Sequence, residues 1–306
     1  MPPYVSVFIP ARNEEGNITP LMESIATCFA EHDINGEVVL VDDGSSDGTR
    51  AEALACAERF PFLQVISHRR NLGLTAAMRT GFRHCRGDII IFLPADMESH
   101  PDEDIPKLLA KIAEGYDVVA GWRQGRRDRK VLASSIYNMV SRRLFNVDAH
   151  DMNWIKAFRR EVVDGMHLRS DWHRFILMIA ASQGYRIGEV KVNYYPRRIG
   201  RSNFGILRIP VSFLDVLVVK FLLTFSRKPM LFFGSLGLLT IGAGGLTLIY
   251  LLWLWLSQHT QQRPVFTFAV FMIVAGLLLF LVGFLAELVV SQAERLDELE
   301  ERLRER

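Results

Sequence analysis

The chain has 306 residues, enough for one large domain or two of moderate size. Its formal net charge is only +2, which provides no overall field for nucleic acid, so we expect no nucleic-acid partner. Three cysteines (Cys28, Cys56 and Cys85) lack the spacing of a metal site and are odd in number, which indicates reduced thiols rather than a disulfide framework. The first residues have no charged segment before an apolar one, so we expect no cleaved signal peptide.

Residues 4–120 alternate short apolar runs with amphipathic stretches. The apolar runs predict strands at Val5–Ile9, Glu37–Val41, Phe62–Ser67, Asp88–Leu93 and Asp117–Ala120. The stretches between them predict helices at Ile18–Glu31, Thr49–Phe60, Thr75–Cys85 and Asp102–Glu114. This alternation is typical of an α/β fold with a mostly parallel sheet. Further along, the pattern predicts helices at Ser134–Phe145 and Phe175–Ala181, and one or two strands within Tyr185–Tyr195.

Two of the predicted strands end in acidic residues. One apolar run stops at Asp42 and Asp43 and enters a turn rich in Gly, Ser and Asp, and another leads into a segment with Asp96 and Glu98. Open α/β sheets bind ligands at the carboxyl edge of their strands. These carboxylates therefore predict a place for a sugar nucleotide and a divalent cation.

Two uncharged stretches, Leu231–Leu256 and Val265–Ala286, each exceed the roughly 20 apolar residues that cross a bilayer core. We expect a multi-pass membrane protein, and the alternative is a buried helical hairpin in a soluble protein. Glycines in the first stretch suit close helix packing in lipid: Gly234, Gly237, Gly242, Gly244 and Gly245. Eight Lys or Arg but one acid lie between Lys191 and Lys228, which predicts that the domain before the spans is cytoplasmic.

Each of the two remaining segments allows two interpretations. Ile206–Phe225 has an apolar stripe at helical spacing and fits amphipathic helices in the headgroup plane, or a core helix of the soluble domain. The charged tail, with Leu296, Leu299 and Leu303, fits a homo-oligomer contact or a solvated helix. The predicted organisation is a catalytic domain (1–205), interfacial helices (206–228), a two-span hairpin (229–290) and a charged helix (291–306).

Four motifs in this order resemble glycosyltransferase family 2, of GT-A fold: Pro10-Ala11-Arg12-Asn13-Glu14-Glu15, Val41–Thr49, Asn71-Leu72-Gly73 and the acidic strand end at Asp96. The two spans extend the resemblance, over nearly the whole chain, to the polyprenyl-phosphate glycosyltransferases, the group of dolichol-phosphate mannose synthase and bacterial undecaprenyl-phosphate sugar transferases. The resemblance implies inverting transfer of a sugar from a nucleoside diphosphate, with UDP-hexose as the expected donor, to polyprenyl phosphate. It places the enzyme at the cytoplasmic face of a bacterial inner membrane, rather than in the endoplasmic reticulum, in the synthesis of a cell-envelope glycan.

The same resemblance assigns the donor side of the site. Pro10, Arg12 and Glu14 would line the nucleotide pocket, while Asp42 or Asp43 would bind base or ribose; the alternative for Asp43-Gly44-Ser45 is a tight turn with side-chain capping. Asp96 and Glu98 would bind Mg²⁺ or Mn²⁺. The chain departs from the family pattern here, because Pro94 stands where most relatives have aspartate and Glu98 where they have glutamine.

The expected catalytic residues are Asp96, Arg123 and Asp151. Asp151 precedes a basic-aromatic-Arg run that resembles the family segment with a catalytic aspartate. The acceptor is a phosphate monoester whose second pKa is about 6, so it is largely deprotonated at pH 7 and needs no general base. We therefore expect Asp151 to orient the acceptor or to ligate the metal.

Basic residues predict the acceptor side. The residues expected to bind the acceptor phosphate are Arg126, His173, Arg174, Arg197, Arg201 and Ser202. The alternatives are a solvated loop for Arg126, a first-turn position after an Asp171 cap for His173, and an unspecific attraction to anionic lipid for Arg197 and its neighbours. A second interpretation of the whole chain is a nucleotide-sugar-binding membrane protein with little or no turnover, which Pro94 and Asn203 (a lysine in the family pattern) favour.

Overall fold

The structure is a computed structural model that describes residues 4–125, 145, 147, 149–166, 168, 172–196, 218, 221 and 228–304. The chain divides into two compact units, Met1–Val216 and Leu217–Arg306. The helices expected at Ser134–Phe145 and Ile206–Phe225 lie, but for isolated positions, outside the described residues, and so does the boundary expected between 205 and 206.

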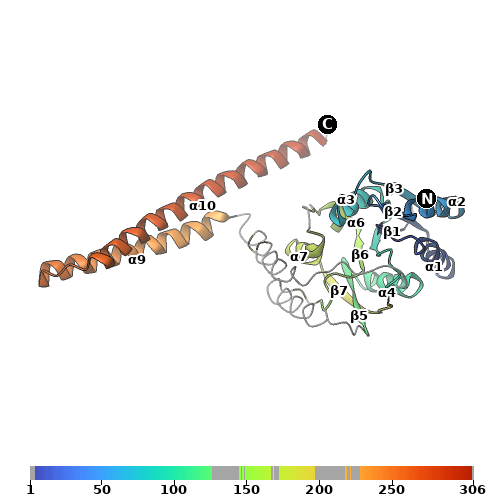
Figure 1. Ribbon diagram of the computed structural model, residues 1–306, viewed down its shortest axis with the longest axis horizontal. Coiled ribbons are helices and arrows are strands. Elements are labelled where there is room, and N and C mark those ends of the chain that lie inside the picture. Colours follow the sequence, from blue (N-terminus) through green and yellow to red (C-terminus); the bar gives the residue numbers. More distant parts are fainter. Residues whose placement is uncertain are drawn as a thin grey trace. The chain divides into compact units, whose positions relative to one another are not determined.

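The first unit is built on one seven-stranded sheet (Figure 1). Its strands are β1 (Val5–Ala11), β2 (Gly36–Asp42), β3 (Leu63–Ser67), β4 (Ile89–Phe92), β5 (Val118–Gln124), β6 (Lys156–Arg159) and β7 (Ile187–Asn193). The order across the sheet is β3-β2-β1-β4-β6-β5-β7. All neighbours are parallel except at β6, which runs antiparallel to both β4 and β5. The predicted α/β class with a mostly parallel sheet is confirmed.

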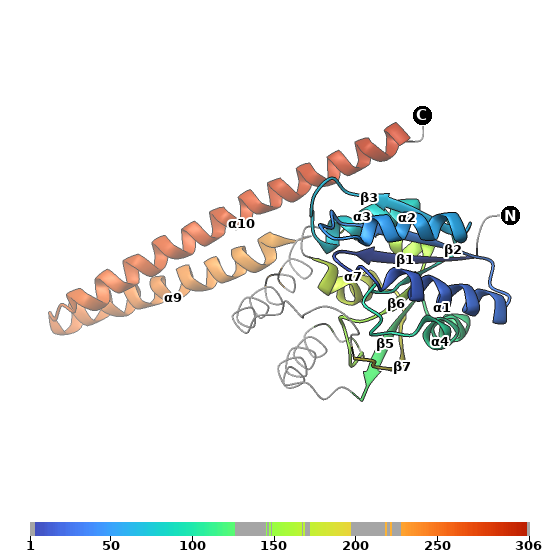
Figure 2. The same cartoon turned by 45° about the vertical axis from the view of Figure 1, so that its right-hand side comes forward.

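Helices cover both faces of this sheet (Figures 1 and 2). They are α1 (Ile18–Glu31), α2 (Thr49–Arg59), α3 (Leu74–His84), α4 (Pro101–Ala113), α6 (Arg160–Asp164), the 3₁₀ turn η1 (Trp172–Phe175) and α7 (Ile176–Ser182). Alternate residues of β1 point to opposite layers: Val5, Val7 and Ile9 join the core under α1 and α4, whereas Phe8 packs on Phe82 of α3. Because both faces are buried, the central strands are continuous apolar runs.

Every strand predicted before residue 121 is present, and Tyr185–Tyr195 contains one strand, β7. The sequence analysis did not predict β6. It has only four residues and begins with a lysine, and strands of that length and composition give little periodicity. Its position matters, because β6 joins the strand before Asp96 to the strand that contains Arg123.

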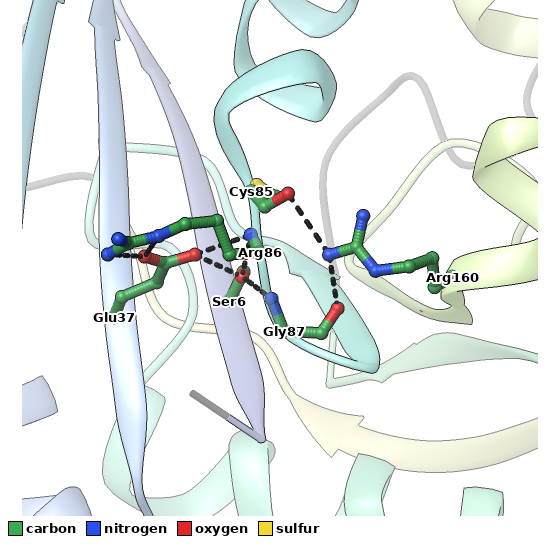
Figure 3. Close-up of polar contacts among 6 residues, drawn as sticks. All are labelled: Ser6, Glu37, Cys85, Arg86, Gly87 and Arg160. Atoms are coloured by element: carbon green, nitrogen blue, oxygen red, sulfur yellow. Dashed lines mark hydrogen bonds and ion pairs between the residues drawn. The ribbon is translucent and has the colours of Figure 1, made fainter. Parts of the chain in front are cut away.

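The amino edge of the sheet is held by a polar network (Figure 3). Glu37 accepts hydrogen bonds from Ser6 Oγ and from the backbone and guanidinium of Arg86, while Ser6 Oγ also accepts the Gly87 amide. Burial opposes the ionisation of Glu37, but these hydrogen bonds outweigh it and hold the pKa of Glu37 below its ordinary value. Arg160 donates to the carbonyls of Cys85 and Gly87. The network fixes the entry to β4 at the edge opposite the predicted site.

The three cysteines are free and buried. Burial raises the pKa of the Cys28 thiol to about 11 and that of Cys85 to about 12. Both thiols are therefore protonated and unreactive at neutral pH, as expected of structural cysteines.

The second unit consists mainly of two helices, α9 (Pro229–Gln258) and α10 (Arg263–Arg304). Pro229–Gln258 and Arg263–Gln292 are long and apolar enough to cross a membrane, and only 17% and 11% of their most apolar windows are buried. The helices pack together where Gly237 meets Gly276, since a Cβ on either glycine would lie 2.6 Å from the other's carbonyl oxygen. Near the start of α9, Glu287 of α10 accepts a hydrogen bond from the Met230 amide. This amide belongs to the first turn of α9, where backbone N–H groups have no partner within the helix.

Candidate functional site

The loops that follow β1 and β2 at the carboxyl edge are joined by reciprocal hydrogen bonds. Asn13 N donates to Ser45 Oγ at 3.0 Å, and Ser46 N donates back to Asn13 Oδ1 at 2.9 Å. Glu14 N donates to Thr49 Oγ1 at 2.8 Å. Asn13 adopts a left-handed conformation with φ 56°, which an asparagine tolerates. Two motifs that are distant in sequence therefore form one rigid wall beside Pro10, Arg12 and Glu14.

Asp42 and Asp43 are both buried, but their carboxylates are used differently. Asp43 accepts hydrogen bonds from the amides of Leu72 (2.9 Å) and Gly73 (2.8 Å) and lies 2.8 Å from His68 Nδ1. Asp42 accepts the Ser45 amide at 3.0 Å through Oδ1, and no described residue bonds its Oδ2. Asp43 therefore holds the Asn71-Leu72-Gly73 loop in place, and Asp42 has an oxygen left for a ligand.

The turn that follows these two carboxylates requires glycine. Gly44 has φ +65°, and a Cβ on it would lie 2.4 Å from the Arg70 carbonyl carbon. Any side chain here would push the 70–73 loop away from Asp43. Both the capped turn and the close approach of the two loops depend on this residue.

The acidic segment after β4 is a turn. Asp96 is 5% exposed, and its Oδ1 accepts the Glu98 amide at 3.2 Å. Met97 between them is buried at φ 56°, a conformation that costs a non-glycine residue about 1–3 kcal/mol and that clusters at functional sites. β4 ends before Asp96 and Glu98. Because these residues are not part of a strand, their two carboxylates can approach one ion.

The donor set fits a divalent ion that the substrate helps to bind. No group of three or more His, Cys, Asp or Glu side chains converges in the part of the chain that the structure describes. Two hard carboxylates suit Mg²⁺ or Mn²⁺ when phosphate oxygens and water complete the coordination. Asp96 and Glu98 match that requirement.

Arg123 and Asp151 form a forked ion pair that is almost buried. Arg123 Nε lies 2.6 Å from Asp151 Oδ2, and Nη2 lies 3.1 Å from Oδ1, with 12% and 9% of the two side chains exposed. The guanidinium stacks 4.4 Å from the ring centroid of Trp154. The structure thus joins two of the three predicted catalytic residues, and Asp151 has both oxygens engaged by Arg123.

Glu189 of β7 holds the Asp151 segment in place, and the sequence analysis missed it. Its carboxylate accepts the amides of His150 and Asp151 and lies 2.7 Å from His150 Nδ1. The His150 ring stacks on Trp122 at 4.0 Å. A lone acid in a short strand gives no sequence signal, because only the fold brings β7 beside residue 150.

Lys156, the first residue of β6, is 3% exposed and was also missed as a site residue. Its Nζ donates to the Trp154 carbonyl at 2.7 Å and lies 5.8 Å from the ring centroid of Phe92. Burial lowers the pKa of this ammonium to about 8, while nearby Asp151 partly opposes that fall. The signal in the sequence was the lone cation within the apolar run Trp154–Phe158.

On the acceptor side, the structure describes two of the six predicted residues. His173 Nδ1 lies 3.0 Å from Thr75 Oγ1 in the first turn of α3, directly after the loop that Asp43 holds. His173 and Arg174 lie in η1, before α7 rather than inside it. Arg126, Arg197, Arg201 and Ser202 lie outside the described residues, as does Asp171.

One cavity, of about 560 Å³, lies elsewhere. Its lining belongs to the amino edge of the sheet and includes Gly36, Leu63 and the exposed Arg83. Ligands of open α/β sheets bind at the opposite edge, where the acidic turns lie, so we place the site there.

The family model for glycosyl transferase family 2 matches residues 6–178. The chain is 32% identical to dodecaprenyl-phosphate galacturonate synthase of Rhizobium johnstonii over 96% of this chain and 89% of that protein. It is 34% identical to undecaprenyl-phosphate 4-deoxy-4-formamido-L-arabinose transferase of Edwardsiella ictaluri, over 94% and 88%. Among solved structures, glucosyl-3-phosphoglycerate synthase of Mycobacterium tuberculosis, in complex with Mg²⁺ and UDP, is similar in fold, with TM-score 0.58 and 19% identity over 71% of this chain and 79% of that one. The resemblance predicted from the motifs is confirmed, and the chain belongs to glycosyltransferase family 2, beside curated relatives that are polyprenyl-phosphate sugar transferases.

Proposed function

We propose that this protein transfers a sugar from a nucleoside diphosphate, with UDP as the nucleotide, to a polyprenyl phosphate, inverting the anomeric centre. The observation that carries the proposal is the forked Arg123–Asp151 pair at the carboxyl edge, where β6 alone separates the strand of Arg123 (β5) from β4, which leads into the acidic turn. Relatives with near full-length matches are named for polyprenyl-phosphate acceptors, which supports the acceptor class.

One set of residues is assigned to the sugar donor and its metal ion. Asp42, through its remaining oxygen, accepts a hydrogen bond from the base or ribose, and Pro10, Arg12 and Glu14 line the same pocket. Asp96 and Glu98 would hold Mg²⁺ or Mn²⁺, which stabilises negative charge on the diphosphate when bound. Pro94 does not conflict with this role, because it lies after β4 has ended, where no ladder donor is required.

An oxygen of the lipid phosphate attacks the anomeric carbon from the face opposite the departing nucleotide. The bond to the diphosphate oxygen breaks, and the leaving group takes the negative charge. Arg123, oriented by Asp151, stabilises that charge. Asp151 is a positioning residue in this account, since both of its oxygens bind the guanidinium and the acceptor is already ionised.

The acceptor confines the reaction to the membrane surface. In this proposal α9 and α10 form the anchor, and the basic segment from Lys191 to Lys228 supports a cytoplasmic location of the catalytic unit. Arg197, Arg201 and Ser202 of that segment, together with Arg126, His173 and Arg174, are the groups proposed for the acceptor phosphate. The donor sugar is proposed to be a hexose or a related pyranose.

The test uses the purified full chain in detergent with undecaprenyl phosphate, Mg²⁺ or Mn²⁺, and a panel of labelled sugar nucleotides that includes UDP-glucose, UDP-galacturonic acid and UDP-4-deoxy-4-formamido-L-arabinose. We expect one sugar to appear on the lipid, with inverted anomeric configuration by NMR. Asp96→Ala should lower the rate at least 100-fold, because it removes an expected metal ligand. Absence of a lipid-linked product with every donor contradicts the proposal.

A further inference from the structure

The buried charges beside Arg123 do not balance. Arg123 and Asp151 neutralise each other through a fork that uses both carboxylate oxygens. Lys156 adds a second cation, and no described carboxylate lies within 4.0 Å of its Nζ. One positive charge is therefore left over in a group of three side chains that are each at least 88% buried.

Lys156 also has more N–H groups than described acceptors. An ammonium has three N–H groups, and the Trp154 carbonyl is the one acceptor among the described residues. A buried charge with so few partners lowers the stability of the fold, and replacement by an apolar side chain of similar volume is often stabilising. Packing alone therefore does not explain why a lysine occupies this buried position.

A second observation points the same way. Trp154 Nε1 is buried and has no hydrogen-bond partner among the described residues, although its ring lies under the Arg123 guanidinium. A buried donor without a partner costs about 1–3 kcal/mol. Two neighbouring residues thus present unsatisfied donors, and both adjoin the pair that orients the reaction.

The position of Lys156 relates these donors to the substrates. In the β4–β6 ladder Lys156 pairs with Phe92, the last residue of β4, and the chain turns from there to Asp96. Lys156 therefore lies beside the point where the chain leaves β4 for the acidic turn. Its strand, β6, separates β4 from β5, which contains Arg123.

We infer that Lys156, together with the unpartnered N–H of nearby residue Trp154, forms a buried subsite for a phosphoryl oxygen of the reacting substrates. The bound oxygen supplies the negative charge that Lys156 lacks in the free protein, and it accepts the spare N–H groups. This proposal rests on the proposed function, since donor diphosphate and acceptor phosphate are the two sources of such an oxygen.

The experiment compares Lys156→Met with the matched control Lys111→Met, whose lysine is paired with Glu114 on α4. Isothermal titration measures binding of UDP with Mn²⁺, and separately of farnesyl phosphate, to the full chain in detergent. We expect Lys156→Met to weaken one of the two ligands at least tenfold, while Lys111→Met leaves both unchanged. Loss of UDP affinity assigns the diphosphate, and loss of farnesyl phosphate affinity assigns the acceptor.

The thermal unfolding temperature separates this role from a structural one. Lys156→Met should be at least as stable as the wild type, because it removes a buried charge. Unchanged affinity for both ligands overturns the subsite. A wild type that binds neither ligand contradicts the proposed function itself.

Trp154→Phe keeps the inference testable should Lys156→Met fail to fold. This variant keeps an aromatic ring for Arg123 but deletes the unpartnered N–H together with part of the indole, so we expect a modest loss of stability and a several-fold loss of affinity for the same ligand. If Trp154→Phe binds both ligands as the wild type does, the subsite is wrong.

Discussion

At the scale of single residues, the site depends on geometry that lysine cannot reproduce at position 123. The Arg123 guanidinium makes two bonds to Asp151 and stacks on Trp154, which together fix its plane. An ammonium offers one compact charge without a fork or a flat face. Both the proposed contact of residue 123 with the leaving group and its fork to Asp151 therefore depend on arginine here.

Arg123→Lys should lower the transfer rate at least tenfold and should also reduce stability, because a lysine cannot make both bonds of the nearly buried fork to Asp151. Hydrogen bonds to charged groups contribute about 1.5–3 kcal/mol, and about 1.4 kcal/mol corresponds to one factor of ten. Steady-state transfer to the lipid acceptor measures the effect. Arg186→Lys is the matched control, because Arg186 also contacts a ring, that of Tyr116, and bonds the Gly115 carbonyl at the other edge of the sheet. Equal rates for the two variants would contradict the role given to Arg123.

At the scale of elements, α4 begins with a buried acid. Asp104 is 1% exposed; Ser99 Oγ donates to its Oδ2 at 2.8 Å, while its Oδ1 has no hydrogen bond to a described residue and lies 3.8 Å from Lys107 Nζ. Burial raises the pKa of Asp104 from 3.8 to about 6. The folded protein therefore binds this proton more tightly than the unfolded chain does, and Asp104 lowers the stability as the pH rises from 4 to 6.

Asp104→Asn should remove this pH dependence. The variant should match the wild type near pH 4 and exceed it by about 2–3 kcal/mol above pH 6, since one pKa unit corresponds to about 1.4 kcal/mol. Unfolding followed by circular dichroism between pH 4 and 8 measures the difference. The control is Asp102→Asn, in the same helical turn, where the half-buried carboxylate accepts a bond from Ser24. A gap that stays constant with pH would show that the Asp104 pKa is not raised.

Most of the fold was predictable at this scale, because buried parallel strands are long apolar runs separated by helical periodicity. The acidic turns were predictable too, since Asp42, Asp43 and Asp96 follow such runs directly. β6 was not, because it has four residues with a cation at each end and lacks the continuous apolar run that identified β4, a strand of the same length. Glu189 and Lys156 were not assigned to the site, because their roles come from pairing β5 with β6 and β7, contacts between residues distant in the chain. For the same reason, sequence alone did not separate the capping role of Asp43 from the open oxygen of Asp42.

At the scale of the whole molecule, the second unit depends on which glycines face the partner helix. The sequence presented five glycines in the first apolar stretch as equivalent. In the structure, a Cβ on Gly237 would lie 2.6 Å from the Gly276 oxygen, whereas one on Gly242 would meet nothing within 4 Å. The hairpin is thus packed along one glycine face.

Gly237→Ala should destabilise the hairpin, because the added methyl group would force α9 away from α10. Gly242→Ala, the matched control, should be neutral or slightly stabilising, since alanine favours a helix. Thermal unfolding of the full chain in detergent should show a lower midpoint for the first variant alone. Identical midpoints would mean that the two helices do not pack along Gly237.

The reversed direction of β6 has a consequence for how such enzymes diversify. β5 ends, and the antiparallel β6 begins, at the carboxyl edge of the sheet. The chain therefore leaves this sheet after Gln124 and rejoins it at Lys156, on the edge where we propose that the reaction takes place. Insertions, deletions or exchanges between these two strands leave the strand order unchanged. Related enzymes can therefore differ in the acceptor that they bind while they keep the same sheet.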